Sequence, residues 1–299
     1  MEATLAQALR WAHGELAGAG VPSPDTDAVL LAAHLMGLSR GEVEAKAILG
    51  ASEPAGFREL VAQRAQRIPL QHLTGKAPFR QLELSVGPGV FVPRPETELL
   101  VQLSLDEARL WREAGVPHPR VVDLGTGSGA IALAIATEDP TTRVFAVEKE
   151  DSAFDWAQQN LRGSKVTLTQ ADYQDYEPEN AGTFCVVVSN PPYVPPEDIP
   201  TEPEVRDYDP PTALYGGADH GMALPCAAMD TAVRLLRPGG ALFMEHAESQ
   251  VAAMERELAA RGFVEIQLHC DLAGKPRATG ARRPDADEDS SIDPHQTLS

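Results

Sequence analysis

Residues 121–130 read Val-Val-Asp-Leu-Gly-Thr-Gly-Ser-Gly-Ala, and the rest of the chain is best understood outward from them. The apolar start predicts a short buried strand, and the residues from Ala130 onward predict a helix directly behind the glycines. Glycines let the backbone turn tightly and approach a ligand closely, while a helix start presents N–H groups without partners. The spacing also satisfies G-x-G-x-x-A, the dinucleotide-binding pattern, although a purely structural turn would read the same. The candidate ligand-binding residues here are Asp123, Gly125, Thr126, Gly127, Ser128 and Gly129.

Strands and helices alternate on both sides of this loop. Predicted strands cover 121–124, 143–147, 166–169, 184–189, 241–245 and 264–268. Predicted helices cover 96–114, 130–137, 152–161, 222–236 and 249–261. Because strands that alternate with helices at this spacing form parallel crossovers, the sequence predicts an α/β fold with a doubly wound, mostly parallel sheet. Residues 280–299 are acidic with few apolar side chains, which predicts a disordered tail.

The first 68 residues show only helical patterns, without alternating strands, and predict a small helical bundle. Ser23 is expected to cap its second helix. The spacing of Ser39 and Glu42 is that of a capping box for the third helix, and Ser52 is expected to begin the fourth.

Turn residues dominate the stretch 69–95, between the helical region and the predicted α/β domain. Short alternating runs lie between those turns, so the stretch is predicted to be a hairpin and linker. The predicted domains are therefore 1–68, the linker 69–95, an α/β domain at 96–279 and the tail 280–299.

Composition narrows the classes of function. The chain has 299 residues, and 25 basic against 44 acidic residues give a formal net charge of −19. This sign argues against stable nucleic-acid binding, which needs Lys and Arg to replace counterions. The 3 cysteines form no C-x-x-C pair, so neither a disulfide framework nor a metal site is expected. No apolar run approaches ~18 residues and no signal-peptide pattern opens the chain, so we expect a cytoplasmic protein without a membrane segment.

Polar residues at the ends of the next two strands point to a nucleoside ligand. Glu148 ends the second strand, where a carboxylate can accept both ribose hydroxyls, a charge-assisted contact of roughly 1.5–3 kcal/mol. After the third strand, Asp172 offers an acceptor for an adenine amino group and Tyr173 a ring to pack on the base. An ordinary surface turn is the alternative for this pair. NAD and S-adenosylmethionine both fit these features, so the choice of cofactor depends on the reacting end.

The loop Asn190-Pro-Pro-Tyr193 supplies that reacting end, after the strand 184–189, where open α/β sheets bind ligands. Successive prolines fix two φ angles and favour extended geometry before them. The side-chain oxygen of Asn190 and the carbonyl of Pro191 can then accept both hydrogens of one planar NH2 group. In-line placement of that nitrogen can contribute up to about 7–11 kcal/mol, and aimed acceptors add an electrostatic contribution. The alternative is a proline-rich turn that merely ends the strand.

Together, the Asn-Pro-Pro-Tyr loop and the glycine loop resemble the amino-group methyltransferases that use S-adenosylmethionine. The chain resembles more closely the protein-(glutamine-N5) methyltransferases that act on peptide chain release factors. That closer resemblance rests on Phe91-Val-Pro-Arg-Pro-Glu-Thr-Glu98, on Pro69-Leu-Gln-His-Leu-Thr-Gly75, and on the runs 215–219, 238–240 and 271–274. It extends over residues 5 to 280, nearly the whole chain.

The resemblance implies methyl transfer from S-adenosylmethionine to the side-chain amide of the glutamine in the Gly-Gly-Gln motif of release factors. It implies a methyltransferase domain at 96–279 and a substrate-recognition domain at 1–68. The glycine loop, Glu148, Tyr173 and Asn190 would contact the cofactor. The catalytic residues would be Asn190, Pro191 and Tyr193, and the substrate-binding residues would also include Pro192, Phe91, Arg94 and Glu96. Two departures are Glu148, where Asp is commoner, and the run 245–250, where a glycine is expected after the strand.

Several alternatives stay open at this point. The same loop serves adenine, so a DNA adenine-N6 methyltransferase is one, against the negative charge; a ribosomal-protein glutamine methyltransferase is another. A nicotinamide-binding oxidoreductase or nucleotide-sensing module is a third, and would bind NAD rather than S-adenosylhomocysteine. The pair Glu245-His246 is interpreted as structural, because methyl transfer to an amide needs no dedicated base when the proton leaves to water. A monomer is expected.

Overall fold

Contacts divide the chain into two compact units. The computed structural model describes residues 3–285. The first unit comprises Met1–Ala77, Val86–Pro88 and Pro200–Asp209, and the second comprises Pro78–Ser85, Gly89–Ile199 and Pro210–Ser299. The segment 200–209 therefore belongs with the helical unit, although its sequence position places it within 96–279. Most of the predicted tail, residues 286–299, lies outside the described residues.

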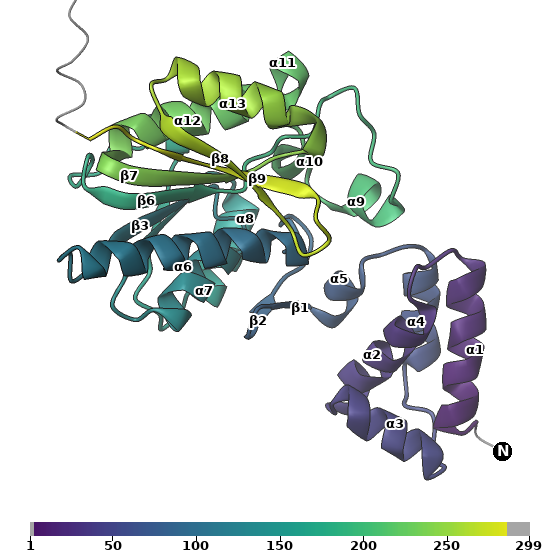
Figure 1. Cartoon of the computed structure of the whole chain (residues 1–299). Helices are drawn as coiled ribbons and strands as arrows, with labels where there is room; N and C mark the ends of the chain where they lie inside the picture. The colour runs from purple at the N-terminus through teal and green to yellow at the C-terminus, as the bar shows by residue number, and fades with distance from the viewer. Residues whose placement is uncertain (1–2, 286–299) are drawn as a thin grey trace, which may run out of the picture. The chain divides into compact units, whose positions relative to one another are not determined.

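The first unit is helical (Figure 1). It contains α1 (Leu5–Gly18), α2 (Pro24–Met36), α3 (Arg40–Ile48), α4 (Phe57–Ala65), α5 (Leu70–Thr74) and, from the later segment, α9 (Pro203–Tyr208). Its core is one apolar cluster whose fully buried members include Leu5, Leu16, Leu31, Phe57 and Val61. Burying each such side chain contributes roughly 1.5–3 kcal/mol, so this cluster holds the helices together.

Side-chain caps were predicted at two helix starts in this unit. At α3 the capping box is confirmed: the Ser39 hydroxyl accepts from the Glu42 N–H, and the Glu42 carboxylate accepts from the Ser39 N–H at 2.8 Å. At α2 the prediction is wrong, because Ser23 precedes the helix but makes no side-chain capping bond. Pro24 occupies the first turn of α2, where a missing N–H costs nothing.

The fourth helix starts later than predicted. Ser52 does not begin it, because its backbone forms an isolated antiparallel bridge with Thr4. The chain turns at Gly56, whose φ of 82° suits glycine, and α4 begins at Phe57.

An ion-pair network ties α9 to the other helices of the first unit. Arg64 lies between two carboxylates, with Nε 2.7 Å from Asp27 Oδ2 and Nη1 2.8 Å from Glu204 Oε1. Arg67 binds the same Glu204 carboxylate through two nitrogens, each at 2.6 Å. These charges are largely buried, and buried charges are tolerated only when they are paired in this way. The network fixes α9 within the first unit.

The second unit contains a seven-stranded sheet in the order β5-β4-β3-β6-β7-β9-β8. The strands are β3 (Arg120–Leu124), β4 (Arg143–Glu148), β5 (Thr167–Gln170), β6 (Phe184–Ser189), β7 (Leu236–Glu245), β8 (Val264–Cys270) and β9 (Pro276–Arg282). The first five pair in parallel, and β9 runs antiparallel between β7 and β8. The expected doubly wound, mostly parallel sheet is confirmed. The strand order reverses between β3 and β6, and open α/β sheets bind ligands at such a reversal.

Helices cover both faces of this sheet. In Figure 1, α6 and α7 lie on one face, and α12 and α13 lie on the other. The longer helices are α6 (Glu98–Glu113), α7 (Ala130–Glu138), α8 (Asp151–Asn160), α12 (Ala223–Leu235) and α13 (Val251–Ala260). The short ones are η1 (Pro95–Thr97), η2 (Tyr173–Asp175), η3 (Glu248–Gln250), α10 (Pro211–Leu214) and α11 (Ala218–Gly221). Strand β6 is buried along its whole length, as a central strand covered on both faces must be.

Strand β9 corrects the predicted start of the tail. Gly280 to Arg282 are not disordered but complete β9, with Gly280 paired to Phe243 and Arg282 paired to Ala241. Gly280 is required there, because a Cβ would lie 2.9 Å from His269 Nε2 and 3.0 Å from the Phe243 ring. The sequence of β9 has few apolar side chains and no alternation of apolar and polar residues, so it could not be recognised as a strand.

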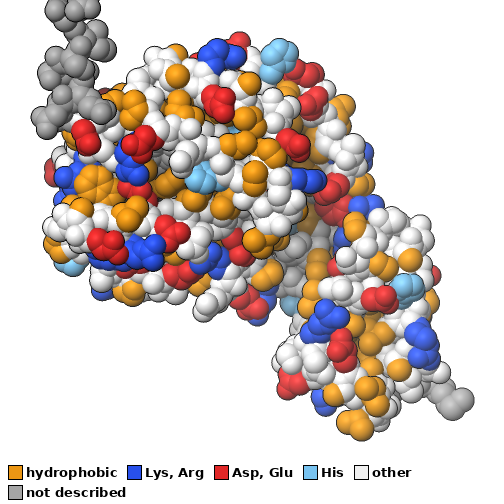
Figure 2. All heavy atoms as spheres, viewed as in Figure 1, with side chains coloured by type: hydrophobic (Ala, Val, Ile, Leu, Met, Phe, Trp, Pro, Cys, Tyr) orange, Lys and Arg blue, Asp and Glu red, His pale blue; other side chains and the backbone are white. Residues whose placement is uncertain are grey.

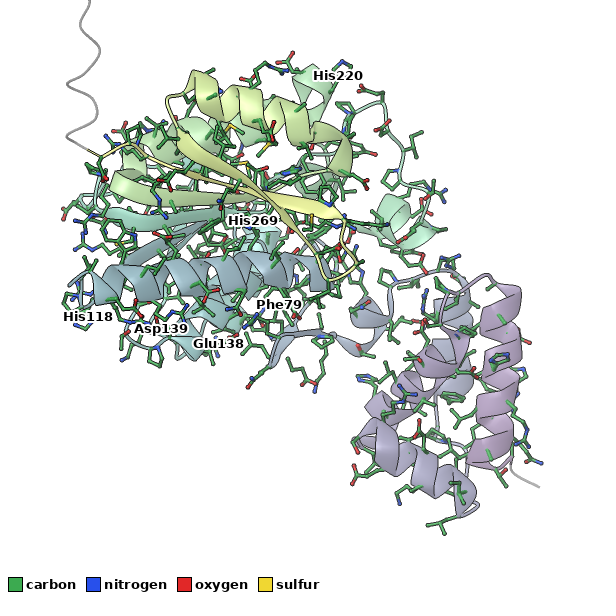
Figure 3. All side chains as sticks on the ribbon, in the orientation of Figure 1. Phe79, His118, Glu138, Asp139, His220 and His269 are labelled. Atoms are coloured by element: carbon green, nitrogen blue, oxygen red, sulfur yellow. The ribbon has the colours of Figure 1, made fainter. Side chains whose placement is uncertain are left out.

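The stretch 69–95 contains the expected hairpin, formed by β1 (Lys76–Phe79) and β2 (Leu82–Ser85) as a two-stranded sheet. Its turn includes Arg80, whose Nη2 lies 2.6 Å from Glu138 Oε2. Figure 3 shows Glu138 at the C-terminal end of α7. Pro78–Ser85 belong to the second unit, so this ion pair lies within it and holds the hairpin tip against α7.

Candidate active site

A cavity of about 530 Å³ opens at the carboxyl ends of β3, β4 and β6. All its lining residues belong to the second unit. The predicted site residues that line it are Phe91, Gly125, Thr126, Gly127, Ser128, Glu148, Asp172, Tyr173, Asn190, Pro192 and Tyr193. Five other predicted residues do not line it: Asp123, Gly129, Pro191, Arg94 and Glu96. The sequence thus identified three loops that the fold brings to one place.

The glycine loop uses conformations that only glycine adopts freely. Gly125, Gly127 and Gly129 have φ values of 70°, 57° and 83°. A Cβ on Gly127 would meet no atom within 4 Å, so bare backbone faces the cavity there. A Cβ on Gly129 would lie 3.2 Å from the Leu161 side chain, so this glycine allows close packing rather than ligand contact.

Asp123 supports the loop from beneath. It is fully buried and accepts the Thr126 hydroxyl at 2.5 Å. Burial raises the pKa of Asp123 to about 7, against the lowering effect of that hydrogen bond. Its carboxyl therefore shapes the loop, and the structure does not place it at the cavity wall.

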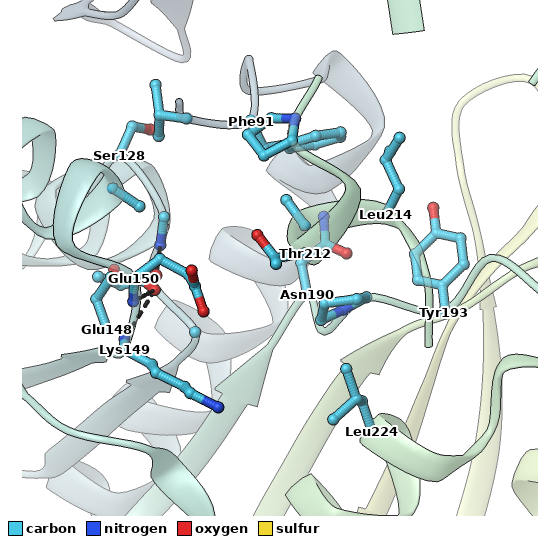
Figure 4. A pocket seen from close by; sticks show the side chains of 18 of the residues that line it. Phe91, Ser128, Glu148, Lys149, Glu150, Asn190, Tyr193, Thr212, Leu214 and Leu224 are labelled. Atoms are coloured by element: carbon cyan, nitrogen blue, oxygen red, sulfur yellow. Dashed lines mark hydrogen bonds between the residues drawn. The ribbon is translucent and has the colours of Figure 1, made fainter. Parts of the chain in front are cut away.

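Glu148 fixes the adjoining edge of the cavity (Figure 4). One carboxylate oxygen accepts the Gly127 N–H at 2.8 Å, and the other accepts the N–H groups of Lys149 and Glu150 at 2.8 and 2.9 Å. Burial raises the pKa of Glu148, and these three donors oppose that shift. A glutamate at this position reaches from the end of β4 to the glycine loop, and oxygen lone pairs remain for a ligand.

Asp172 and Tyr173 form a third wall. Asp172 pairs with the Lys149 ammonium at 3.0 Å. Burial opposes the shift, but the Gln174 N–H and Lys149 hold the pKa of Asp172 below its usual range. The Tyr173 hydroxyl donates to the Leu224 carbonyl at 3.1 Å, and burial raises the pKa of Tyr173, so it stays a neutral phenol.

The Asn-Pro-Pro-Tyr loop is held by side chains that come from distant parts of the sequence. Asn190 donates from Nδ2 to the Thr97 hydroxyl at 3.2 Å, and Thr97 donates to Glu245 Oε2 at 2.8 Å. The Tyr193 hydroxyl donates to the other oxygen of Glu245 at 3.3 Å. Burial raises the pKa of Tyr193, with the Glu245 charge adding to the effect. Both Asn190 and Tyr193 also line the cavity (Figure 4).

Sequence reasoning missed two of these residues. Thr97 lies inside the quoted motif 91–98, but nothing in the motif singles out its hydroxyl. Glu245 was interpreted as structural rather than as an acid or base; the structure shows its partners, because it is the buried acceptor for both Thr97 and Tyr193. In the region where a glycine was expected, Gln250 instead donates to the Tyr193 carbonyl at 2.8 Å.

The flanking predicted residues lie beside the cavity. The Arg94 guanidinium lies 4.9 Å from the centroid of the Phe91 ring, a cation–π contact, and Phe91 faces the cavity. Glu96 contributes negative charge near Glu245 and Tyr193, and it raises the pKa of both.

Two other properties bear on the site. Among residues 3–285, no helix combines the length and the apolarity needed to cross a membrane. Within the described part of the chain, no group of three or more His, Cys, Asp or Glu side chains is arranged to hold a metal ion.

Comparison with known proteins decides the family. Residues 7–75 match the model of the PrmC N-terminal domain, and residues 95–202 match the methyltransferase small domain. A release factor glutamine methyltransferase of Streptomyces coelicolor is 48% identical over 270 residues, which cover 90% of this chain and 94% of that protein. The chain belongs to the release factor glutamine methyltransferase family. Another member, from Bifidobacterium longum, is 41% identical over 89% of this chain and 95% of its own.

Membership in the release factor glutamine methyltransferase family confirms the resemblance seen in the sequence and makes the chain a methyltransferase. One relative has a different name: a 4-amino-L-phenylalanine/4-methylamino-L-phenylalanine methyltransferase of Streptomyces pristinaespiralis is 38% identical over 87% of this chain and 88% of that protein. That name describes an aromatic amine rather than an amide.

Proposed function

We propose that this chain transfers a methyl group from S-adenosylmethionine to the side-chain amide nitrogen of the glutamine in the Gly-Gly-Gln motif of peptide chain release factors. Its 48% identity to a release factor glutamine methyltransferase supports the substrate. One observation carries the chemistry. The amide nitrogen of Asn190 donates to the Thr97 hydroxyl, so the Asn190 oxygen is left to accept a hydrogen bond in the cavity.

The cavity fits the cofactor. Its volume of about 530 Å³ lies in the range of small-molecule sites, and bare backbone at Gly127 allows close approach. Glu148 would accept the ribose hydroxyls, Tyr173 would pack on the base, and Asp172 would accept from the adenine amino group. When bound, the cofactor supplies an electrophilic methyl carbon on a positively charged sulfur.

The residues of the Asn-Pro-Pro-Tyr loop would prepare the nucleophile. An amide nitrogen is a poor nucleophile because its lone pair is delocalised. Asn190 Oδ1, at the cavity, would accept one of its hydrogens. The Pro191 carbonyl would accept the other, and this contact requires that oxygen to be reached from the cavity, which Pro191 does not line. Two acceptors would orient the nitrogen and stabilise the positive charge that develops on it. Tyr193 and Phe91 would line the path of the glutamine side chain. The departing proton would leave to water, and no base is needed.

The helical region 1–68 would recognise the release factor. The second unit alone supplies every residue that lines the cavity, so the helices are free for another task. Deleting residues 1–68 should reduce methylation of intact release factor at least about 100-fold, the loss of roughly 2.7 kcal/mol of binding. The affinity for S-adenosylhomocysteine, measured by calorimetry, should stay within threefold. Equal activity of the truncated chain on release factor would contradict this role.

The same proposal includes a monomeric, cytoplasmic enzyme without stable nucleic-acid binding. Basic and acidic side chains are intermixed on the face seen in Figure 2, where no continuous basic area is visible. With a net charge of −19, duplex DNA would be repelled. A salt-sensitive gel shift with duplex DNA would instead favour an adenine-N6 methyltransferase.

Mass spectrometry of release factor after incubation with enzyme and S-adenosylmethionine tests the proposal. One added methyl on the Gly-Gly-Gln glutamine is expected, and none on a release factor whose glutamine is replaced by alanine. Parallel incubations with 4-amino-L-phenylalanine and with ribosomal proteins test the other substrates. Methylation of those substrates with none on release factor would refute the proposal.

A further inference from the structure

Three buried or half-buried side chains form a chain of hydrogen bonds that ends in the cavity. Glu245, at the end of β7, is 3% exposed, and Thr97, in η1, is 5% exposed. Thr97 lies between Glu245 Oε2 at 2.8 Å and Asn190 Nδ2 at 3.2 Å. Asn190 and Thr97 line the cavity, whereas Glu245 does not.

The direction of each hydrogen bond follows from the chemistry of the groups. An ionised carboxylate can only accept, so the single Thr97 hydroxyl hydrogen must point to Glu245. The Thr97 oxygen can then only accept from Asn190, and Nδ2 is the only donor atom in that side chain. The order therefore fixes Nδ2 toward Thr97 and leaves Oδ1 on the other side of the carboxamide.

Orientation matters because the two ends of a carboxamide have nearly the same shape and opposite hydrogen-bonding character. A flipped Asn190 would present NH2 to the NH2 group of a substrate amide, and two donors would face each other. The site would then lose one of the two acceptors that orient the nucleophile, although its shape would be unchanged.

We propose that Thr97 and Glu245 are positioning residues that lock the carboxamide of Asn190 with its oxygen toward the substrate amide, an inference that rests on the proposed function. Neither touches the reacting atoms. Glu245 also accepts the Tyr193 hydroxyl at 3.3 Å, so one carboxylate orients two residues of the Asn-Pro-Pro-Tyr loop.

The surroundings of Glu245 set the condition under which the lock works. Burial raises the pKa of Glu245 to about 7; the charge of Glu96 on η1 adds to the shift, while Thr97, Tyr193 and Arg277 on β9 lower it. Below this pH a protonated Glu245 could donate to Thr97, and the polarity of the chain would no longer be fixed. Assays are therefore made at pH 8.

Thr97→Val removes the hydroxyl with little change of shape and is the first test. Methyl transfer to release factor should slow by about tenfold or more, the cost of one hydrogen bond to a charged group. The loss should fall on kcat, with the affinity for S-adenosylhomocysteine unchanged. Thr97→Ser, which keeps the hydroxyl, should recover most of the rate. Thr167→Val, an exposed site on the edge strand β5, is the matched control and should behave as wild type.

Side-chain amide exchange gives a readout independent of the substrate. In protein labelled with ¹⁵N-asparagine, the Asn190 signal is the one missing from the Asn190→Ala spectrum. Its Nδ2 hydrogens should exchange slowly in wild type and Thr97→Ser, and fast in Thr97→Val. Unchanged exchange in Thr97→Val, or an unchanged rate of transfer, would overturn the lock. If wild type fails to methylate release factor at all, the proposed function fails, and the exchange measurement still decides the lock.

Discussion

The two halves of the cavity are built in different ways. On the cofactor side, the glycine loop and Glu148 are joined mainly through backbone N–H groups. On the substrate side, the carboxamide of Asn190 depends on side chains, Thr97 and Glu245, that are 93 and 148 residues distant from their respective partners.

This difference separates two tasks. Among the natural side chains only proline removes a backbone donor, so the cofactor side is defined by loop conformation and by a single carboxylate. A series of hydrogen bonds between side chains fixes which group donates and which accepts, as well as where each group lies. It works only if every residue in the series supplies the required donor or acceptor. Substitutions on the substrate side should therefore affect the rate, and those on the cofactor side should affect the affinity.

Asn190→Ala should have the largest effect, because it removes the acceptor that faces the substrate and leaves the cofactor side intact. By analogy with other preorganised sites, kcat should fall about 100- to 1000-fold. The dissociation constant of S-adenosylhomocysteine should stay within threefold of wild type by calorimetry. A large loss of cofactor affinity together with the rate would show that the two halves are not separate.

Glu148→Ala should produce the opposite pattern with a smaller effect. It leaves three backbone N–H groups without their acceptor and removes the candidate ribose contact, so the affinity for S-adenosylhomocysteine should fall about 10- to 100-fold. Glu148→Asp is the matched control, because it keeps the charge but shortens the reach to Gly127. Its affinity for S-adenosylhomocysteine should lie between those of wild type and Glu148→Ala. If the affinity of Glu148→Ala equals that of wild type, the assignment of this carboxylate is wrong.

Asp123→Asn should give the smallest effect and shows how the loop is supported. The pKa of Asp123 is about 7 in the folded chain, against a usual value of 3.8. The folded state therefore holds a proton that the unfolded state releases, so this group favours folding less as pH rises from 4 to 7.

Asparagine can still accept the Thr126 hydroxyl and does not titrate. The melting temperature of Asp123→Asn relative to wild type should therefore rise by about 2–4 °C between pH 5 and pH 8. A difference that stays constant over this range would mean that Asp123 is already ionised at pH 5 in the folded chain, as it is in the unfolded chain.

Local patterns in the sequence were sufficient for most of the second unit. Most of the parallel strands are apolar runs bounded by turn residues, so their positions could be predicted. The start of β7 could not: it begins at Leu236, whereas the strand was predicted at 241–245, because Pro238-Gly-Gly240 indicates a turn. Strand β9 could not, because its residues include Arg277, Thr279 and Gly280, and the space for them is set by Phe243 and His269 on neighbouring strands. Helix α9 was also missed, since its place depends on Arg64 and Arg67, far away in the sequence.

The candidate site divides in the same way. Glu148 ends a strand, Asn190 directly follows one, and Gly127 lies in the loop behind another. Because strand ends in a parallel sheet meet at one edge, their proximity could be predicted. The partnership of Thr97 with Glu245 depends on how the turn before α6 meets the end of β7, which no local pattern encodes. Arg94 and Glu96 belong to a recognised motif, but their side chains do not line the cavity.

The helical unit is discontinuous along the chain, because Pro200–Asp209 returns to it after the Asn-Pro-Pro-Tyr loop. Recombination that replaced the N-terminal helices at a single junction would leave Glu204 facing a foreign sequence without Arg64 and Arg67. Exchanging the helical unit between family members therefore requires replacing two separate segments of the sequence together. We expect the helical unit to be inherited together with the catalytic sequence.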